Sequence, residues 1–193
     1  MSTATERLAH LALALTLLGP VEQLDGEVQR AVQSWRRPEL EAPMRTASGS
    51  GHGALVLGGL LAVAIAGGPA GPATARAAIV VLAPVNLVVE ALKWSVNRRR
   101  PDGERRRSNS SFPSSHAANA AGIALVFGRR WRRLSPGFWL LAVLVGFSRM
   151  YLNRHFLSDV LCGVAIGVGV GWYTFAWLRA RGWTWEERGP ASG

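Results

Sequence analysis

The chain has 193 residues, 49% of them hydrophobic, and a formal net charge of +10. This length suits a single domain, and this apolar content excludes a disordered or linker-like protein. Of its 22 basic residues only Lys93 is a lysine. A basic balance predicts anionic partners, and the long uncharged stretches favour a membrane lipid or a phosphorylated substrate over nucleic acid, which we do not expect as a partner. The single cysteine, Cys162, excludes an intrachain disulfide and a thiolate metal cage.

Uncharged segments predict an all-α protein, a bundle of six transmembrane helices. In chain order they cover residues 8–21, 53–75, 77–92, 114–128, 134–148 and 160–178. The last comes closest to the roughly 20 apolar residues that one crossing requires. Prolines at 69 and 72 predict that the second helix ends near Gly68. The alternative is a soluble all-α domain, but tryptophans near the segment ends favour a membrane.

The connecting segments are unequal. Residues 20–52 form a long polar stretch of mixed charge, in which we expect an amphipathic surface helix at about 25–35. Residues 94–113 are rich in arginine and serine, and 129–133 form a short basic turn. Glu6 and Arg7 make a poor start for a secretion signal, so we expect none. We interpret residues 1–193 as a single membrane-embedded domain, with a motif-bearing core at about 53–178 and a polar C-terminal tail at 179–193.

Residues capable of chemistry lie at the ends of the predicted spans. The third span ends at Lys93 and the fourth begins near His116. The fifth ends at Arg149, and the sixth begins near His155 and Asp159. In an up-and-down bundle the end of each odd span and the start of the next lie at the same face. We therefore expect these residues to form a site at one membrane face, whichever way the protein is inserted.

The spacing of these residues predicts phosphoryl chemistry. Asp159 follows His155 by four residues, so its carboxylate reaches one imidazole nitrogen and leaves the other free as nucleophile or base. Lys93, Arg100 and Arg149 have too few acids nearby to pair them all. Unpaired cations at a membrane boundary favour an anion, and the arginine fork suits phosphate. These features indicate phosphoryl transfer through a phosphohistidine.

Three ordered motifs resemble the signatures of the type 2 phosphatidic acid phosphatase superfamily. They are Lys93 followed after six residues by Arg100-Pro101, then Pro113-Ser114-Ser115-His116, then Ser148-Arg149 with His155 and Asp159. The resemblance covers the chain from about Leu55 onward. One position departs from the family pattern, since Ser115 stands where the pattern has glycine. Its side chain either adds a hydrogen bond to phosphate or crowds the pocket.

The resemblance implies a role for each matching residue. His155 would attack phosphorus and Asp159 would orient it, while His116 would protonate the departing oxygen and then activate water. The substrate-binding residues would be Lys93, Arg100, Ser114, Ser115 and Arg149. No metal or other cofactor is expected, because these cations and backbone donors stabilise the transition-state charge.

We expect the remaining charged residues to have structural roles or to act outside the site. Glu90 would pair with Lys93 or Arg76 inside the bundle, because a lone carboxylate is costly in lipid. Arg98, Arg99 and residues 105–107 match no motif position, and we expect them to attract lipid headgroups or substrate.

The resemblance implies an integral-membrane phosphatase that hydrolyses a lipid phosphate or diphosphate. Its substrate would be a prenyl diphosphate, such as undecaprenyl diphosphate, or a phosphatidate-like lipid. The surrounding membrane lipids would be its other partners. Two alternatives remain: a lipid phosphotransferase on the same scaffold, and a catalytically silent membrane protein that binds anionic lipid. Vanadium haloperoxidases share the motif chemistry but are soluble. The charge count does not decide orientation. The resemblance favours a site on the outer face of the cell membrane, and the sequence predicts no oligomeric state.

Overall fold

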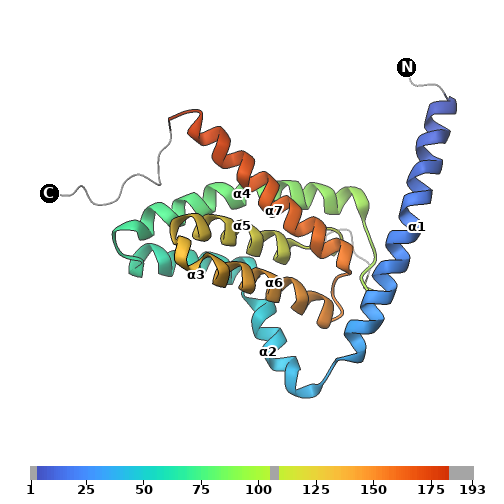
Figure 1. The fold of residues 1–193 in the computed structure, drawn as a ribbon, viewed down its shortest axis with the longest axis horizontal. Helices are drawn as coiled ribbons and strands as arrows, with labels where there is room; N and C mark the ends of the chain where they lie inside the picture. Colours follow the sequence, from blue (N-terminus) through green and yellow to red (C-terminus); the bar gives the residue numbers. More distant parts are fainter. Residues whose placement is uncertain (1–3, 105–108, 183–193) are drawn as a thin grey trace.

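Helices make up all the regular structure in residues 4–104 and 109–182, the part of the chain that the computed structural model describes (Figure 1). No strand occurs in that part, so the prediction of an all-α fold is confirmed. The long helices and two short 3₁₀ turns are α1 (Ala4–Ser34), α2 (Pro38–Gly49), α3 (Gly53–Ala66), η1 (Gly68–Ala70), α4 (Gly71–Val96), α5 (Ser115–Arg130), η3 (Arg132–Leu134), α6 (Ser135–Tyr151) and α7 (Leu157–Arg179).

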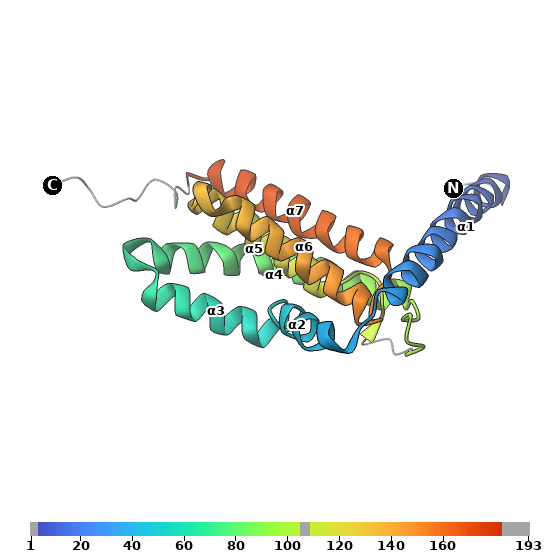
Figure 2. The same cartoon turned by 60° about the horizontal axis from the view of Figure 1, so that its bottom comes forward.

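Helix α5 lies at the centre of the bundle and packs against α4, α6 and α7. Helix α3 lies beside α4, while α2 and α1 gather at the end of the bundle where α4 and α6 finish and α5 and α7 begin (Figures 1 and 2). Because α4 and α6 end where α5 and α7 begin, the segments that carry the three sequence motifs meet at one end, as the sequence predicts.

Glycines on α7 bring it into backbone contact with α5. A Cβ added at Gly163 would lie 2.5 Å from the Ser114 carbonyl oxygen, and one at Gly167 would lie 2.3 Å from the Ala118 oxygen. Only glycine allows so close an approach, a common device where helices meet in lipid. As a result the Ser114 amide at the start of α5 donates to the Asp159 carbonyl of α7 at 3.0 Å.

Three helical segments of the described chain are long and apolar enough to cross a membrane: Gly68–Val96, Arg132–Tyr151 and Leu157–Arg179. The pair α2 and α3 would add a fourth, but the two are bent by 65°. Large apolar side chains such as Ile65, Leu87 and Leu140 are exposed on the outside of the bundle, where lipid would cover them. A multi-pass membrane protein is therefore supported, while the count of six spans stays a prediction.

The N-terminal part differs from the prediction. The helix expected at about 25–35 is present as the second half of α1, which continues through Pro20 to Ser34. Because α2 follows almost at once, the segment 20–52 is not a long loop. A proline inside a helix costs about 3 kcal/mol, and side-chain contacts of the second half of α1 with the α6–α7 connection, described below, offset this. Helix α2 has the sequence signs of a helix start, Pro38 at its first position and Glu39 and Glu41 in its first turn.

The proline-rich break is where the sequence places it. Helix α3 ends at Ala66, and η1 and α4 begin around Pro69 and Pro72. The last helix begins three residues before the predicted start at 160 and ends one residue after the predicted end at 178.

Candidate active site

The His155 imidazole lies in the connection between α6 and α7 and is only 2% exposed. Its Nδ1 lies 2.7 Å from the Ser111 carbonyl oxygen. A carbonyl only accepts, so Nδ1 carries the proton and the neutral ring has its lone pair on Nε2. The Arg100 guanidinium lies 3.3 Å from Nε2 through Nη1. The ring is thus held in one tautomer, with Nε2 facing a cation.

Burial is the main reason that the pKa of His155 falls from 6.5 to about 4, and the charges of Arg100 and Arg149 act in the same direction. The nearby Asp159 carboxylate acts the other way without cancelling these effects. At neutral pH the imidazole is therefore uncharged, which is the form that can act as a nucleophile.

Asp159 lies in the first turn of α7 and is fully buried. It accepts hydrogen bonds from the Phe156 amide at 2.8 Å, the Ser111 hydroxyl at 2.5 Å and Arg98 Nη1 at 2.7 Å. Its Oδ2 lies 3.8 Å from His155 Nδ1, beyond hydrogen-bond distance. The spacing of four gives no direct bond, because α7 begins at Leu157 and His155 precedes the helix.

Of the two cations of the first motif, Arg100 lies against this ring. Arg100 is 5% exposed, and its guanidinium donates to Asn109 Oδ1 at 2.6 Å and to the Arg154 carbonyl at 2.9 Å. Burial, followed by the charge of Arg154, lowers the pKa of Arg100. Lys93, near the end of α4, is buried and paired with Glu90 at 2.8 Å. The predicted pairing of Glu90 with Lys93 is confirmed, but Glu90 is exposed and the pair does not lie inside the bundle.

Arg149 lies near the end of α6 and is nearly buried. Its Nη1 donates to the Ser48 hydroxyl of α2. Its Nε is buried and makes no hydrogen bond to any residue in the described part of the chain. A buried donor without an acceptor is costly, so this nitrogen is a candidate contact for a ligand oxygen.

The second motif begins α5. The Ser114 hydroxyl caps the helix by accepting from the Ala117 amide at 3.4 Å. Ser115 is the first residue of the helix and is partly buried. His116 follows and lies within electrostatic range of Arg149, His155 and Lys93. The motifs that lie apart in the sequence are thus brought together.

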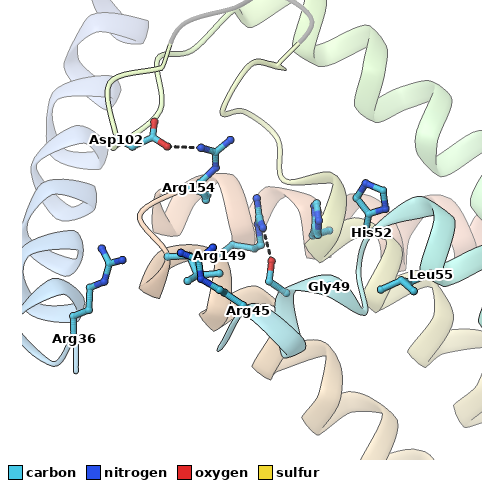
Figure 3. Close-up of a pocket in the computed structure, with 11 residues that line it drawn as sticks. Arg36, Arg45, Gly49, His52, Leu55, Asp102, Arg149 and Arg154 are labelled. Atoms are coloured by element: carbon cyan, nitrogen blue, oxygen red, sulfur yellow. Dashed lines mark hydrogen bonds and ion pairs between the residues drawn. The ribbon is translucent and has the colours of Figure 1, made fainter. Parts of the chain in front are cut away.

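A cavity of about 660 Å³ lies at this end of the bundle (Figure 3). His116 and Arg149 are the predicted site residues that line it, while His155 and Arg100 are not part of its lining. The full set of lining residues is Arg36, Arg45, Ser48, Gly49, His52, Leu55, Asp102, His116, Arg149, Leu152 and Arg154. Four of these residues are arginines and one is an acid, so the cavity suits an anion.

Several residues of the site carry no sequence motif. Ser111 and Asn109 hold His155 and Arg100, and Ser48 and His52 bring α2 and the start of α3 to the cavity. For Ser111 and Asn109, the only signal in the sequence is that they lie close to the motifs along the chain. In the described residues, no group of three or more His, Cys, Asp or Glu side chains is arranged to hold a metal ion.

Arg98 corrects a sequence interpretation. We expected it to attract headgroups or substrate, but it is largely buried and pairs with Asp25 and Asp159, each at 2.7 Å. Helix α4 ends at Val96, and the next residue, Asn97, has the left-handed conformation, φ 46°. The chain turns there, so that Arg98 enters the interior. Arg99 is exposed and donates to the Gly103 carbonyl, while residues 105–107 lie outside the described residues.

Comparison with known proteins agrees with the motifs. Residues 74–183 match the family model of the PAP2 superfamily. The chain belongs to the PAP2 superfamily. The resemblance to the type 2 phosphatidic acid phosphatases is thereby confirmed over the region that contains all three motifs.

Individual relatives extend this family assignment. The chain is 41% identical over 88 residues to a lipid A 1-phosphatase of Porphyromonas gingivalis, covering 44% of this chain and 19% of that protein. It is 39% identical over 89 residues to a decaprenylphosphoryl-5-phosphoribose phosphatase of Mycobacterium tuberculosis, covering 42% and 48%. The matched segments thus span less than half of these relatives.

A solved structure shows the same fold. The PAP2-type phosphatidylglycerolphosphate phosphatase of Bacillus subtilis aligns with a TM-score of 0.68 at 26% identity, covering 90% of this chain and 94% of that one. The all-helical arrangement is therefore that of a PAP2 membrane protein.

Proposed function

We propose that this protein is an integral-membrane phosphatase that hydrolyses a lipid phosphate or diphosphate through a phosphohistidine at His155. One observation carries the proposal: His155 is neutral, its Nδ1 proton is held by Ser111, and its Nε2 faces the Arg100 guanidinium. A neutral imidazole with one nitrogen fixed presents the other as a nucleophile. Family membership adds support, since both curated relatives described above are named as phosphatases.

The reaction would take two in-line steps. In the first, the Nε2 lone pair attacks phosphorus and the bond to the leaving oxygen breaks, while protonated His116 gives that oxygen a proton. Burial and the charge of Arg149 lower the pKa of His116 to about 3 in the protein without substrate, so the negative charge of the bound phosphate would have to raise it for this step. In the second, His116 takes a proton from water, the water oxygen bonds to phosphorus and the phosphorus–nitrogen bond breaks. His116 lines the cavity, where both leaving group and water have access to it.

Charge stabilisation would come from Lys93, Arg100 and Arg149, so that no metal or other cofactor takes part. The buried Nε of Arg149 lacks a partner among the described residues, and a phosphoryl oxygen would supply one. The Ser115 amide at the start of α5 would add a backbone donor, since the first amides of a helix have no intrahelical acceptor and its N-terminus favours anions, whereas the Ser114 amide already donates to the Asp159 carbonyl.

The substrate class follows from the surroundings of the site. A cavity at the end of a lipid-facing bundle suits a phosphate at the headgroup level of a membrane lipid. A prenyl diphosphate or a phosphatidate-like lipid fits this position, and the decaprenyl relative favours the prenyl class. We further propose that residues 1–193 act as one domain, that its helices make six crossings and that the site faces outward. A phosphotransferase, in which a lipid hydroxyl replaces water, would use the same first step.

The test is phosphate release by purified protein in detergent. A panel of a prenyl diphosphate, phosphatidate and phosphatidylglycerol phosphate identifies the substrate, and an added acceptor lipid separates hydrolysis from transfer.

His155→Ala should abolish release while gel filtration shows a folded protein, and Asp159→Asn should be milder because it disturbs orientation only. Activity should survive EDTA and be inhibited by vanadate, which imitates the five-coordinate transition state. Activity of His155→Ala within threefold of wild type would remove His155 as nucleophile.

A further inference from the structure

One face of α1 presents amide side chains to the connection that carries His155. Gln29 Nε2 donates to the Met150 carbonyl at 3.2 Å, and Gln33 Nε2 donates to the Met150 and Tyr151 carbonyls at 3.0 and 3.2 Å. These carbonyls belong to the last turn of α6, whose C=O groups lack intrahelical donors. The second half of α1 therefore caps α6 just before the chain reaches His155.

Asp25 continues this polar face one helical turn earlier, four residues before Gln29, and is 2% exposed. Its Oδ1 accepts from the Ser158 amide at 2.9 Å, and its Oδ2 accepts from the Ser158 hydroxyl at 2.5 Å. Its Oδ2 also pairs with Arg98 Nη2 at 2.7 Å. The carboxylate thus binds the first turn of α7 and the segment after α4 together.

Arg98 connects Asp25 to the candidate site. Its Nη1 donates to Asp159 Oδ1 and to the Ser158 hydroxyl, both at 2.7 Å, and its guanidinium lies 4.5 Å from the centre of the Phe156 ring. Burial opposes the charge of Arg98, yet the hydrogen bond to Asp25 and the interactions with Asp159 outweigh it and raise the pKa of Arg98. One guanidinium is therefore held between two buried carboxylates.

This arrangement makes the position of Asp159 depend on α1. Removing the Asp25 charge would leave Arg98 with a single carboxylate, and its second nitrogen would keep at most a neutral oxygen as acceptor. Arg98 would shift toward Asp159, whose hydrogen bonds to Ser111 and to the Phe156 amide are short and directional. The Ser111 carbonyl also accepts a hydrogen bond from His155 Nδ1, so a shift of Asp159 and Ser111 would move the imidazole.

We propose that Asp25, acting through Arg98, is a positioning residue for Asp159 and His155. Helix α1 lies outside the residues 74–183 that match the family model, so this element extends the site beyond the three motifs. The inference rests on the proposed role of His155.

The test compares Asp25→Asn with Glu27→Gln. Both remove one carboxylate charge from α1 at constant shape, but Glu27 is exposed and accepts a bond only from Gln23, at 2.9 Å, among the described residues. With the best substrate of the panel, Asp25→Asn should lower kcat about tenfold, roughly 1.4 kcal/mol, at unchanged KM. Glu27→Gln should leave both constants within twofold of wild type. A kcat for folded Asp25→Asn equal to that of Glu27→Gln would overturn the proposal.

A double-mutant cycle separates positioning from general destabilisation. If Asp25 acts through Arg98, adding Asp25→Asn to Arg98→Gln should cost less than threefold in kcat, whereas independent effects would multiply. If Asp25→Asn does not fold, Ser158→Ala disturbs the same network more gently and should lower kcat about threefold at unchanged KM. An unchanged kcat in Ser158→Ala would then overturn the proposal.

Measuring the His155→Ala variant in the same assay distinguishes a failure of the proposed function from a failure of the positioning role. Full activity of His155→Ala would remove the proposed function itself. An inactive His155→Ala beside a normal Asp25→Asn would remove only the positioning role.

Discussion

Replacing Gly167 by alanine should force α5 and α7 apart. The new Cβ would lie 2.3 Å from the Ala118 carbonyl oxygen and 3.0 Å from the Ala121 Cβ. Ordinary contact begins near 3.4 Å, so the helix backbones must separate by about 1 Å, because the blocking atom belongs to a backbone and cannot rotate away. Overpacking of this kind costs about 1–3 kcal/mol.

Gly169→Ala is the matched control on the same helix. Gly169 is exposed, and its added Cβ would have no neighbour within 4 Å. Alanine is better than glycine in a helix by about 0.5–1 kcal/mol, so this variant should be as stable as wild type or more so. Both variants gain the same helix preference, and their difference of about 1–3 kcal/mol therefore reports the clash alone.

Thermal unfolding of both variants in one detergent provides the comparison, with turnover measured on the folded protein. Gly167→Ala should unfold at the lower temperature. It should also lose turnover, because α5 carries His116 and is capped by Ser114, while α7 carries Asp159. If Gly167→Ala were as stable as Gly169→Ala, the close contact between the two helices would be refuted.

Three further predictions concern the site and its support. Since only neutral His155 is nucleophilic and burial lowers its pKa to about 4, protonation of His155 should cost no activity at pH 5.5, where an imidazole of pKa 6.5 would be only about 9% neutral; an acid limb of kcat/KM near pH 6.5 would contradict this. Ser115→Gly should leave turnover unchanged or raise it, and a tenfold loss in phosphate-release kinetics would show that the hydroxyl binds phosphate. Tyr151→Phe removes a hydroxyl that donates to the Arg37 carbonyl at 3.1 Å and accepts from its amide at 2.7 Å; it should lower stability in thermal unfolding by about 1–2 kcal/mol at unchanged kcat, and a kcat loss beyond twofold would argue against a purely structural role.

Apolar periodicity and prolines located most of the bundle from the sequence. The long apolar runs of α4 and α7 and the break at Gly68 depend on local composition, which a single sequence displays. In the N-terminal part, the sequence does not predict that α1 continues through Pro20 or that residues 38–49 form a helix, because α1 is stabilised by partners elsewhere. The sequence predicts a surface helix at about 25–35, and the partners that fix it, carbonyls at the end of α6 bound by Gln29 and Gln33, lie far away in the chain.

The candidate site, like the fold, is only partly predictable from the sequence. Motif spacing predicted that His116, Arg149 and His155 meet at one end of the bundle, and the up-and-down order of the helices was sufficient for that. The partner of His155 was not predictable, because Nδ1 donates to a backbone carbonyl, that of Ser111, which any residue type would supply. Asp25 lies 73 residues from Arg98, and no local pattern links two such residues.

The position of Lys93 allows the candidate site to be probed by chemical labelling. It is the only lysine of the 193 residues, and it is buried in an ion pair with Glu90 at the site. A reagent that acylates amines therefore has one side-chain target, and that target reports on the site. A lipid whose phosphate binds Lys93 at the proposed site would slow this labelling, so mass spectrometry of one tagged peptide would rank candidate lipids without any turnover assay.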